Sequence, residues 1–268
     1  MNLTQLLSET QAVLFDMDGV LYRGNTPLPG VSDVIAFCDA NEIAYACVTN
    51  NSTRTPRQFE TRMATMGIHI PESHILTSSQ VASRYLRANY PKGTTVYAMG
   101  MSGLQQVLFG DGYFVACDHK PQLVVQGADM ALTYDKLRLG CLAVRAGARF
   151  IATNPDRTFP TEEGLQPGAG ALLAIVQAAT GVVPFVVGKP ETTMFHVALN
   201  LLQAKRESTL MVGDRLETDI RGARQAGLRS LLVLTGVTSA EEAASSADQP
   251  DAVVNDLAEL LAVWQTLQ

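Results

Sequence analysis

The chain has 268 residues and a net charge of −6, with 47% apolar and 17% charged residues. This length and composition are typical of one large or two ordinary globular domains and exclude a disordered chain. The acidic balance argues against a nucleic-acid-binding protein, whose surface would be basic. No stretch reaches the roughly 18 apolar residues of a membrane span, and the first ten residues lack the features of a signal peptide. We therefore expect a cytoplasmic protein with no membrane or nucleic-acid partner.

The cysteines and histidines form no metal-binding pattern. The cysteines are scattered without a CxxC pair, which predicts reduced, mostly buried thiols. The histidines lie near predicted turns or helix faces, where a surface or packing role is expected. These residues are Cys38, Cys47, Cys117 and Cys141, and His69, His74, His119 and His196.

The N-terminal part of the chain alternates between strands and helices. A continuous apolar run at residues 12–15 predicts a strand buried on both faces. A polar loop over 21–29 precedes a helix that ends near Asn41. Residues 43–48 and 75–77 predict two further strands. Each is followed by a helix, the first with Pro56 in its first turn and Gly67 at its end, the second over 79–88.

A second alternating series follows Pro91-Lys92-Gly93. Its expected strands are 95–99, 123–126, 150–152 and 184–187, and its expected helices are 133–146 and 171–179, with a polar loop over 157–170. The last part of the chain predicts strands at 210–212 and 231–234 and helices at 191–204, 217–226 and 256–267. This alternation predicts an α/β fold with a mostly parallel sheet and helices on both faces. We divide it into a core, 1–82 plus 183–268, and an inserted domain, 83–182.

Two acids stand directly at the end of the first predicted strand. Asp16 and Asp18 follow the apolar run, and Gly19 lets the chain turn sharply. Two carboxylates held together at a strand end are costly unless a cation pairs with them. Ligands in open α/β sheets bind beyond the carboxyl ends of the strands. The position therefore predicts a site for a hard metal ion.

Three further strand ends carry polar residues that parallel strands would bring to the same edge. They are Thr49 with Asn50, Lys189, and Asp214 with Asp219. Acids bind Mg²⁺, a lysine binds phosphate, and a hydroxyl with backbone amides can hold phosphate oxygens. Among these groups Asp16 can act as a nucleophile towards a phosphoryl group, and Asp18 can transfer protons.

The sequences DMDGV, TNNS, GKP and GDRLETD, in this order, resemble the four motifs of the haloacid dehalogenase superfamily of phosphatases. The run ATNPDRTFPTEEGLQPGAGALLAIVQAATG resembles the cap of the NagD-like, class IIA branch, which includes relatives of 4-nitrophenylphosphatase and phosphoglycolate phosphatase. The resemblance covers nearly the whole chain. It implies a Rossmann-like three-layer core, with residues 83–182 forming an inserted C2-type α/β cap.

The resemblance also implies a role for each acid. Asp16 would be the nucleophile and a Mg²⁺ ligand, and Asp18 the general acid and base, binding the metal through its backbone carbonyl. Asp214 would be the third protein ligand, and Asp219 would orient this shell from further out. Arg215 departs from the asparagine that is common after the metal-binding aspartate, which leaves the contribution of this side chain open.

The remaining candidate residues would bind the substrate. By the same resemblance Thr49 would donate a hydrogen bond to phosphate, helped by the amide of Asn50, and Lys189 would pair with both the nucleophile and the phosphate. Asn154 and Asp156 in the insert are candidates for contacting the leaving group.

Structural interpretations of these residues stand beside the functional ones. Asp16 and Asp18 could cap a turn, and Lys189 alone would be a solvated lysine. Asp219 could be an acid stabilised by a helix dipole. Asn154 and Asp156 could be turn formers.

The function that we predict is a Mg²⁺-dependent phosphomonoester hydrolase. It would act on a small phosphorylated metabolite, such as a sugar phosphate or a nucleotide monophosphate, through an aspartyl-phosphate intermediate. One alternative is a C–halogen hydrolase of the same superfamily, although Asp18 argues against it because a halide needs no proton. The other is a non-catalytic protein that binds a phospho-ligand. The sequence leaves the physiological substrate and a homodimer open.

Overall fold

The computed structural model describes residues 2–161 and 164–267. By compactness the chain divides into two units, which are described separately. The first contains Met1–Thr49, Arg57–Leu76 and Lys189–Gln268, and the second contains Asn50–Pro56 and Thr77–Gly188. Compactness does not test whether the insert is a cap, so the division at 83 and 182 stays a prediction.

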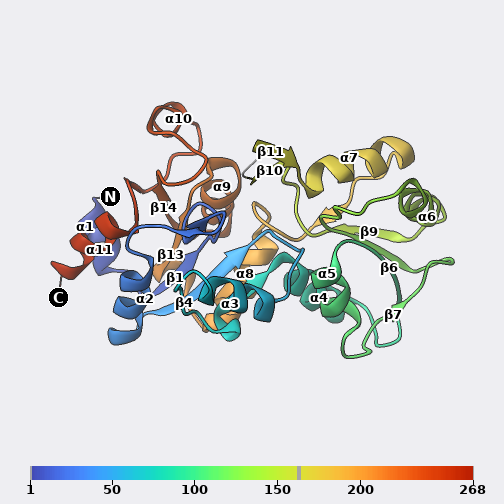
Figure 1. Ribbon diagram of the computed structural model, residues 1–268, viewed down its shortest axis with the longest axis horizontal. Helices are drawn as coiled ribbons and strands as arrows, with labels where there is room; N and C mark the ends of the chain where they lie inside the picture. The colour runs from blue at the N-terminus through green and yellow to red at the C-terminus, as the bar shows by residue number, and fades with distance from the viewer. Residues whose placement is uncertain (1, 162–163, 268) are drawn as a thin grey trace. The chain divides into compact units, whose positions relative to one another are not determined.

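The first unit is built on a sheet with the order β15-β14-β13-β1-β4-β5 (Figure 1). Its central strand β1 pairs in parallel with both neighbours, so that Leu14 lies opposite Met211 on one side and Ala46 on the other. The C-terminal ends of β1, β4, β13 and β14 therefore share one edge of the sheet. The strands are β1 (Ala12–Phe15), β4 (Ala44–Thr49), β5 (Ile75–Thr77), β13 (Thr209–Gly213), β14 (Arg229–Val233) and β15 (Ala252–Val254).

Helices cover both faces of this sheet. Val13 and Phe15 belong to one buried cluster with Phe37 and Trp264, which come from the helices on one face. Because side chains alternate along a strand, Leu14 points to the opposite face. The helices of the first face are α1 (Leu3–Ser8), α2 (Val31–Ala40), α3 (Pro56–Ala64) and α11 (Leu257–Gln265). Those of the opposite face are α8 (Thr192–Leu202), which contacts β4, and α9 (Arg221–Ala226), which packs on α8.

The second unit has a parallel sheet of its own, with the order β12-β9-β8-β6-β7. Val124 and Phe150 form a buried cluster with Val144 and Leu173 from helices α6 and α7, whereas α4 and α5 lie on the other side of the sheet (Figure 1). The strands are β6 (Thr95–Met99), β7 (Val115–Ala116), β8 (Leu123–Gln126), β9 (Arg149–Ala152) and β12 (Phe185–Val186). The helices are α4 (Ser78–Asn89), α5 (Ser102–Phe109), α6 (Tyr134–Arg145) and α7 (Ala169–Thr180).

The predicted α/β class with parallel sheets is confirmed, but both predicted polar loops contain hairpins. The loop 21–29 holds β2 (Tyr22–Arg23) paired with β3 (Thr26–Pro27). The loop 157–170 holds β10 (Thr158–Thr161) paired with β11 (Gly164–Pro167), and its residues 162–163 lie outside the described residues. These strands are too short and too polar to give a hydrophobic period, so the sequence pattern hides them.

The helices of the structure differ from the predicted ones at four places. The helix over 217–226 begins with a π turn, η3 (Leu216–Ile220), before α9, and π turns have no clear sequence signature. Helices α1, α5 and α10 (Ala240–Ser245) were not predicted. Gly103 lowers the helix propensity of α5, and α1 and α10 have only six residues each. Two 3₁₀ turns, η1 (Glu72–His74) and η2 (Arg206–Ser208), precede β5 and β13. None of the helices described is both long and apolar enough to cross a membrane.

Candidate active site

The C-terminal edge of the first unit's sheet collects the predicted site residues of that unit. Asp16 follows β1, Thr49 ends β4, Asp214 follows β13, and Lys189 comes just before α8. These polar side chains are nearly withdrawn from solvent, with exposed fractions of 8% for Asp16, 2% for Lys189 and 1% for Asp214. Polar groups are rarely buried to this degree unless they are paired or bind a ligand. The burial excludes a solvated lysine at position 189.

Lys189 is held by contacts in the interior of the unit. Its Nζ lies 2.5 Å from Asp16 Oδ1 and 2.7 Å from Asp219 Oδ1, and it donates to the carbonyl of Val48 at 3.3 Å. Two of these contacts, to Asp16 and to the Val48 carbonyl, are hydrogen bonds, and the contact with Asp219 is an ion pair. Lys189 is therefore held against the carboxylate of Asp16, the predicted nucleophile.

Asp219 lies deeper in the site than its expected place near a helix N-terminus. One oxygen pairs with Lys189, while Oδ2 accepts hydrogen bonds from the backbone N–H groups of Asp214, at 3.2 Å, and Arg215, at 3.1 Å. A Cβ added at Gly213 would overlap the Asp219 side chain. The π turn thus directs Asp219 back onto the strand end, where it holds both the lysine and the segment that carries Asp214.

Asp214 has one carboxylate oxygen fixed and one left over. Oδ2 accepts a hydrogen bond from the backbone N–H of Val237 at 2.8 Å. Oδ1 is buried, and no hydrogen-bond partner for it is found among the described residues. Glycines enclose this carboxylate, since a Cβ at Gly19 would lie 2.5 Å from Oδ2 and one at Gly236 would overlap it. A buried oxygen without a partner costs free energy that a bound cation would remove.

The charges of the site also favour a cation. Burial raises the pKa of Asp16 well above its usual range, Lys189 opposes this shift, and Asp219 and Asp214 add to it. Burial, with Asp219, likewise raises the pKa of Asp214 to about 7. Burial disfavours the charged form of Lys189, but Asp16 and Asp219 outweigh it and raise its pKa.

Ligand oxygens of Asp16, Asp214 and Asp219 lie within 4.8 Å of one another, so these carboxylates could hold a metal ion. When ionised, they carry three negative charges against the single positive charge of Lys189, which leaves a deficit that a divalent cation would neutralise. The donor set consists of carboxylate oxygens, the ligands that Mg²⁺ prefers. The residues present therefore fit the predicted magnesium ion.

The other predicted residues of this unit occupy the same edge. Asp18 is half-buried and forms an isolated bridge with Tyr22. Thr49 is 2% exposed at the end of β4. The guanidinium of Arg215 lies 3.6 Å from the carboxylate of Glu217.

The predicted residues of the second unit form a hydrogen-bonded cluster of their own. Asn50 Nδ2 donates to both carboxylate oxygens of Asp156 at 3.1 Å, and Asn154 Nδ2 donates to Asp156 Oδ2 at 2.9 Å. The hydroxyl of Thr153 donates to Asn154 Oδ1 at 2.8 Å. Asp156 thus orients the side chain of Asn50, the residue that directly follows Thr49.

Sequence reasoning missed the segment after β14. Gly236 and the N–H of Val237 contact Asp214. The signal available was Gly236, two residues after the predicted strand 231–234, but a backbone amide has no residue-type signature. Sequence reasoning also missed Tyr22, whose hydroxyl is buried near Asp18. Burial and the charge of Asp18 raise the pKa of this tyrosine.

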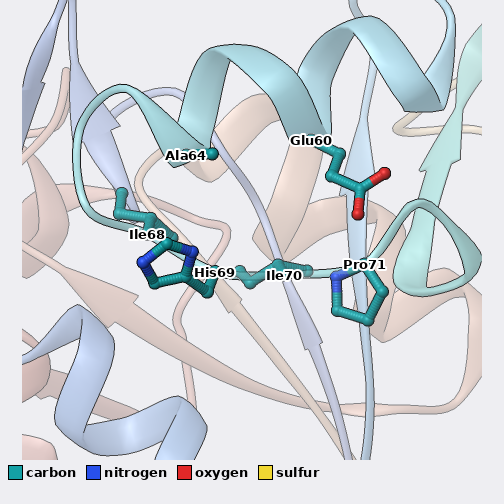
Figure 2. Close-up of a pocket in the computed structure, with 6 residues that line it drawn as sticks. All are labelled: Glu60, Ala64, Ile68, His69, Ile70 and Pro71. Atoms are coloured by element: carbon teal, nitrogen blue, oxygen red, sulfur yellow. The ribbon is translucent and has the colours of Figure 1, made fainter.

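A hollow elsewhere in the first unit has no comparable chemistry. Its volume of about 210 Å³ is below that of typical ligand pockets. Figure 2 shows its lining, in which the polar side chains are Glu60 and His69. Neither is among the predicted site residues. The complete lining is Glu60, Ala64, Ile68, His69, Ile70 and Pro71.

Comparison with known proteins agrees with this geometry. A sequence model of haloacid dehalogenase-like hydrolases matches residues 13–113, and a second HAD hydrolase-like model matches residues 186–260. The chain is 37% identical to acid sugar phosphatase of Staphylococcus saprophyticus over 94% of its own length and 96% of the relative's. It is 36% identical to 5′-nucleotidase YutF of Bacillus subtilis, over 92% and 95%.

Solved structures show the same similarity. The 4-nitrophenylphosphatase of Thermotoga maritima has a TM-score of 0.92 and 31% identity, covering 98% of this chain and 99% of that one. NagD of E. coli K-12 has a TM-score of 0.87 and 34% identity, covering 93% and 98%. A glycerol phosphate phosphatase of Mycobacterium tuberculosis, solved with magnesium, has a TM-score of 0.87 and 33% identity, covering 95% and 77%. The chain belongs to the haloacid dehalogenase superfamily and is a phosphatase of its NagD-like, class IIA branch.

Proposed function

We propose that the chain is a Mg²⁺-dependent phosphomonoesterase that acts through an aspartyl-phosphate on Asp16. The observation that carries this proposal is the buried carboxylate of Asp16, paired with Lys189 at 2.5 Å and clustered with the carboxylates of Asp214 and Asp219. An attacking carboxylate beside a fixed ammonium and a cation-binding cluster is the arrangement that phosphoryl transfer requires.

In the first step, a carboxylate oxygen of Asp16 attacks the phosphorus, and the bond from phosphorus to the ester oxygen breaks. Asp18 gives its proton to the departing oxygen, which leaves as an alcohol. Lys189 fixes Oδ1 of Asp16, and its positive charge offsets the negative charge of the transferring group. Thr49 and the amide of Asn50 would hold phosphate oxygens.

In the second step, a water molecule attacks the phosphorus of the aspartyl-phosphate. Asp18, now a carboxylate, takes the proton of this water, and the bond from phosphorus to Asp16 breaks to release inorganic phosphate. Asp16 and Asp214, with the backbone carbonyl of Asp18, would hold Mg²⁺, and Asp219 would fix Lys189 and the Asp214 backbone. When bound, Mg²⁺ supplies charge neutralisation on the phosphoryl oxygens.

We further propose that the substrate is a small phosphorylated metabolite and that residues 83–182 form a C2-type cap that selects it. The names of the relatives support this, because they refer to a sugar phosphatase, a nucleotidase and a glycerol phosphate phosphatase. The hydrogen-bonded Asn154 and Asp156 offer polar groups that could form hydrogen bonds with the hydroxyl groups of a leaving group. The free thiols of all four cysteines agree with a cytoplasmic location.

The test of the chemistry is phosphate release from 4-nitrophenyl phosphate. The wild type should turn over with Mg²⁺ and lose activity in EDTA, and Asp16→Asn should be inactive under both conditions. Borohydride reduction during turnover should convert Asp16 to homoserine, which peptide mass spectrometry detects, because an acyl phosphate is reduced where a free carboxylate is not. Equal activity of Asp16→Asn and wild type would refute the nucleophile, and activity that survives EDTA would refute the metal requirement.

The substrate class needs a separate measurement. A panel of sugar phosphates, nucleoside monophosphates, glycerol phosphates and phosphopeptides should give the highest kcat/KM for one of the small metabolites. Asp156→Asn should raise KM for that metabolite more than for 4-nitrophenyl phosphate. A preference for phosphopeptides would contradict the proposed substrate class while leaving the chemistry intact.

A further inference from the structure

The segment that follows β14, Thr235–Thr238, contacts both the loop Asp16–Gly19 after β1 and Asp214 after β13. Strand β14 is the neighbour of β13, and β13 is the neighbour of β1. The three C-terminal ends therefore occupy the same edge, and the segment leaves the sheet beside Asp214. We call residues 235–238 the bridge segment.

The bridge segment contacts Asp214 through its backbone. The N–H of Val237 donates to Asp214 Oδ2 at 2.8 Å, and the N–H of Thr238 donates to the Asp214 carbonyl at 3.2 Å. Gly236 leaves no room for a side chain, because a Cβ there would overlap the Asp214 carboxylate. These contacts engage Oδ2 of Asp214, while Oδ1 has no hydrogen-bond partner among the described residues.

The other end of the bridge segment contacts the loop that carries Asp16 and Asp18. The hydroxyl of Thr235 donates to the carbonyl of Gly19 at 2.6 Å. The guanidinium of Arg23, in β2, donates to the carbonyls of Thr235 and Gly236. Gly19 itself has a φ of +87°, so its conformation tolerates few other residues. Hydrogen bonds of the bridge segment thus connect the Asp16–Gly19 loop at one end with the Asp214 carboxylate at the other.

We propose that the bridge segment sets the spacing between the Asp16–Gly19 loop and Asp214, and that Thr235 and Arg23 are positioning residues for Mg²⁺ binding. This inference rests on the proposed function, because it assumes that Asp16 and Asp214 hold the ion. Neither Thr235 nor Arg23 needs to touch the ion or the substrate. Their effect is exerted through Gly19 and Gly236, whose backbone positions they fix.

The test measures Mg²⁺ affinity without substrate, by isothermal titration calorimetry well below the unfolding transition. Thr235→Val removes the hydroxyl and keeps the shape, and it should weaken Mg²⁺ binding about three- to tenfold, the effect of losing one neutral hydrogen bond. Thr235→Ser should restore binding. The matched control is Thr266→Val, which removes an equivalent hydrogen bond from a hydroxyl to a carbonyl, 2.7 Å long, at the end of α11, and should leave the affinity unchanged.

Arg23 provides a second route because its side chain is exposed and its replacement does not disturb the core. Arg23→Met should weaken Mg²⁺ binding in the same direction and raise the Mg²⁺ concentration that gives half-maximal activity, with a smaller change in KM for substrate. Should Thr235→Val fail to fold, Arg23→Met decides the question alone.

Asp214→Asn separates the failure of this inference from the failure of the proposed metal site. If Asp214→Asn binds Mg²⁺ as the wild type does, the metal site itself is misplaced and the inference fails with it. If Asp214→Asn loses binding but Thr235→Val and Arg23→Met bind normally, the metal site stands and the bridge segment has no positioning role. A loss in melting temperature with unchanged Mg²⁺ affinity would show a purely structural role and would also overturn the inference.

Discussion

Replacing Lys189 by methionine should expose the electrostatic cost of the buried carboxylates. The side chain is 2% exposed and pairs with Asp16 at 2.5 Å and with Asp219 at 2.7 Å. Removing one partner of a buried ion pair costs about 3–5 kcal/mol, because the remaining charges are left uncompensated. A loss of this size lowers the melting temperature of a unit of this size by roughly 6–20 °C. Methionine keeps most of the volume of the lysine, so loss of packing adds little.

The size of this effect should depend on pH, and the sign follows from the carboxylates. Burial already raises the pKa of Asp16, and removing the ammonium raises it further. Lowering the pH favours the protonated form of Asp16, for which the missing ammonium matters less, whereas raising the pH makes the uncompensated buried charge costlier. The destabilisation by Lys189→Met should therefore be larger at the higher pH.

The assay is differential scanning calorimetry in EDTA at both pH values. The control is Lys205→Met, which removes the same charge at an exposed position and should change the free energy of unfolding by less than about 0.5 kcal/mol. If Lys189→Met has the same melting temperature as the wild type at both pH values, the stabilising ion pair between Lys189 and the carboxylates is refuted. An equal loss at both pH values would show that the cost does not come from ionised carboxylates.

Three further results are expected. Burial raises the pKa of Asp214 to about 7 in the folded protein. In EDTA, the contribution of this group to stability is therefore full below its unfolded pKa of about 4 and is lost as the pH rises to about 7. Mg²⁺ should therefore raise the melting temperature more near pH 8 than near pH 5.5, and an equal rise would contradict this. Maleimide should label the partly exposed Cys117 and Cys141 before Cys38 and Cys47. Burial raises the pKa of both buried thiols, that of Cys38 to about 12, so fewer of them are reactive thiolates. Mass spectrometry of timed samples reports the order of labelling. Tyr22→Phe should leave the free energy of unfolding within about 1 kcal/mol or raise it, since the buried hydroxyl has no hydrogen-bond partner among the described residues, and a larger loss on urea unfolding would show a partner for it.

The sequence predicts those strands that consist of a continuous run of buried apolar residues. Val13 to Phe15 and Leu210 to Val212 are apolar runs buried on both faces, and both are central strands. The hairpin of β2 and β3 is invisible in the pattern, because its strands have two residues each and expose most of their side chains. Its place depends on tertiary contacts, such as the packing of the Arg62 guanidinium over the Tyr22 ring at 4.7 Å.

The candidate site follows the same division. The convergence of Asp16, Lys189 and Asp214 could be predicted, because parallel strand ends meet at one edge. The inward direction of Asp219 could not, since its position looks like an ordinary first helical turn and only the π turn shows otherwise. Contacts made by backbone amides, such as that of Val237, depend on a loop conformation that residue types do not encode.

Asp219 changes how the charge of the site is balanced. If it lay outside the site, Lys189 would neutralise Asp16 alone, and a single further carboxylate, Asp214, would remain for the metal. Instead the ammonium is shared between Asp16 and Asp219, at 2.5 and 2.7 Å. Asp16 is then only partly neutralised, so its burial with Asp214 is costly without a second cation. In the proposed mechanism Lys189 and Mg²⁺ are therefore complementary, because the lysine would position the attacking carboxylate and the ion would supply the charge that the lysine must share.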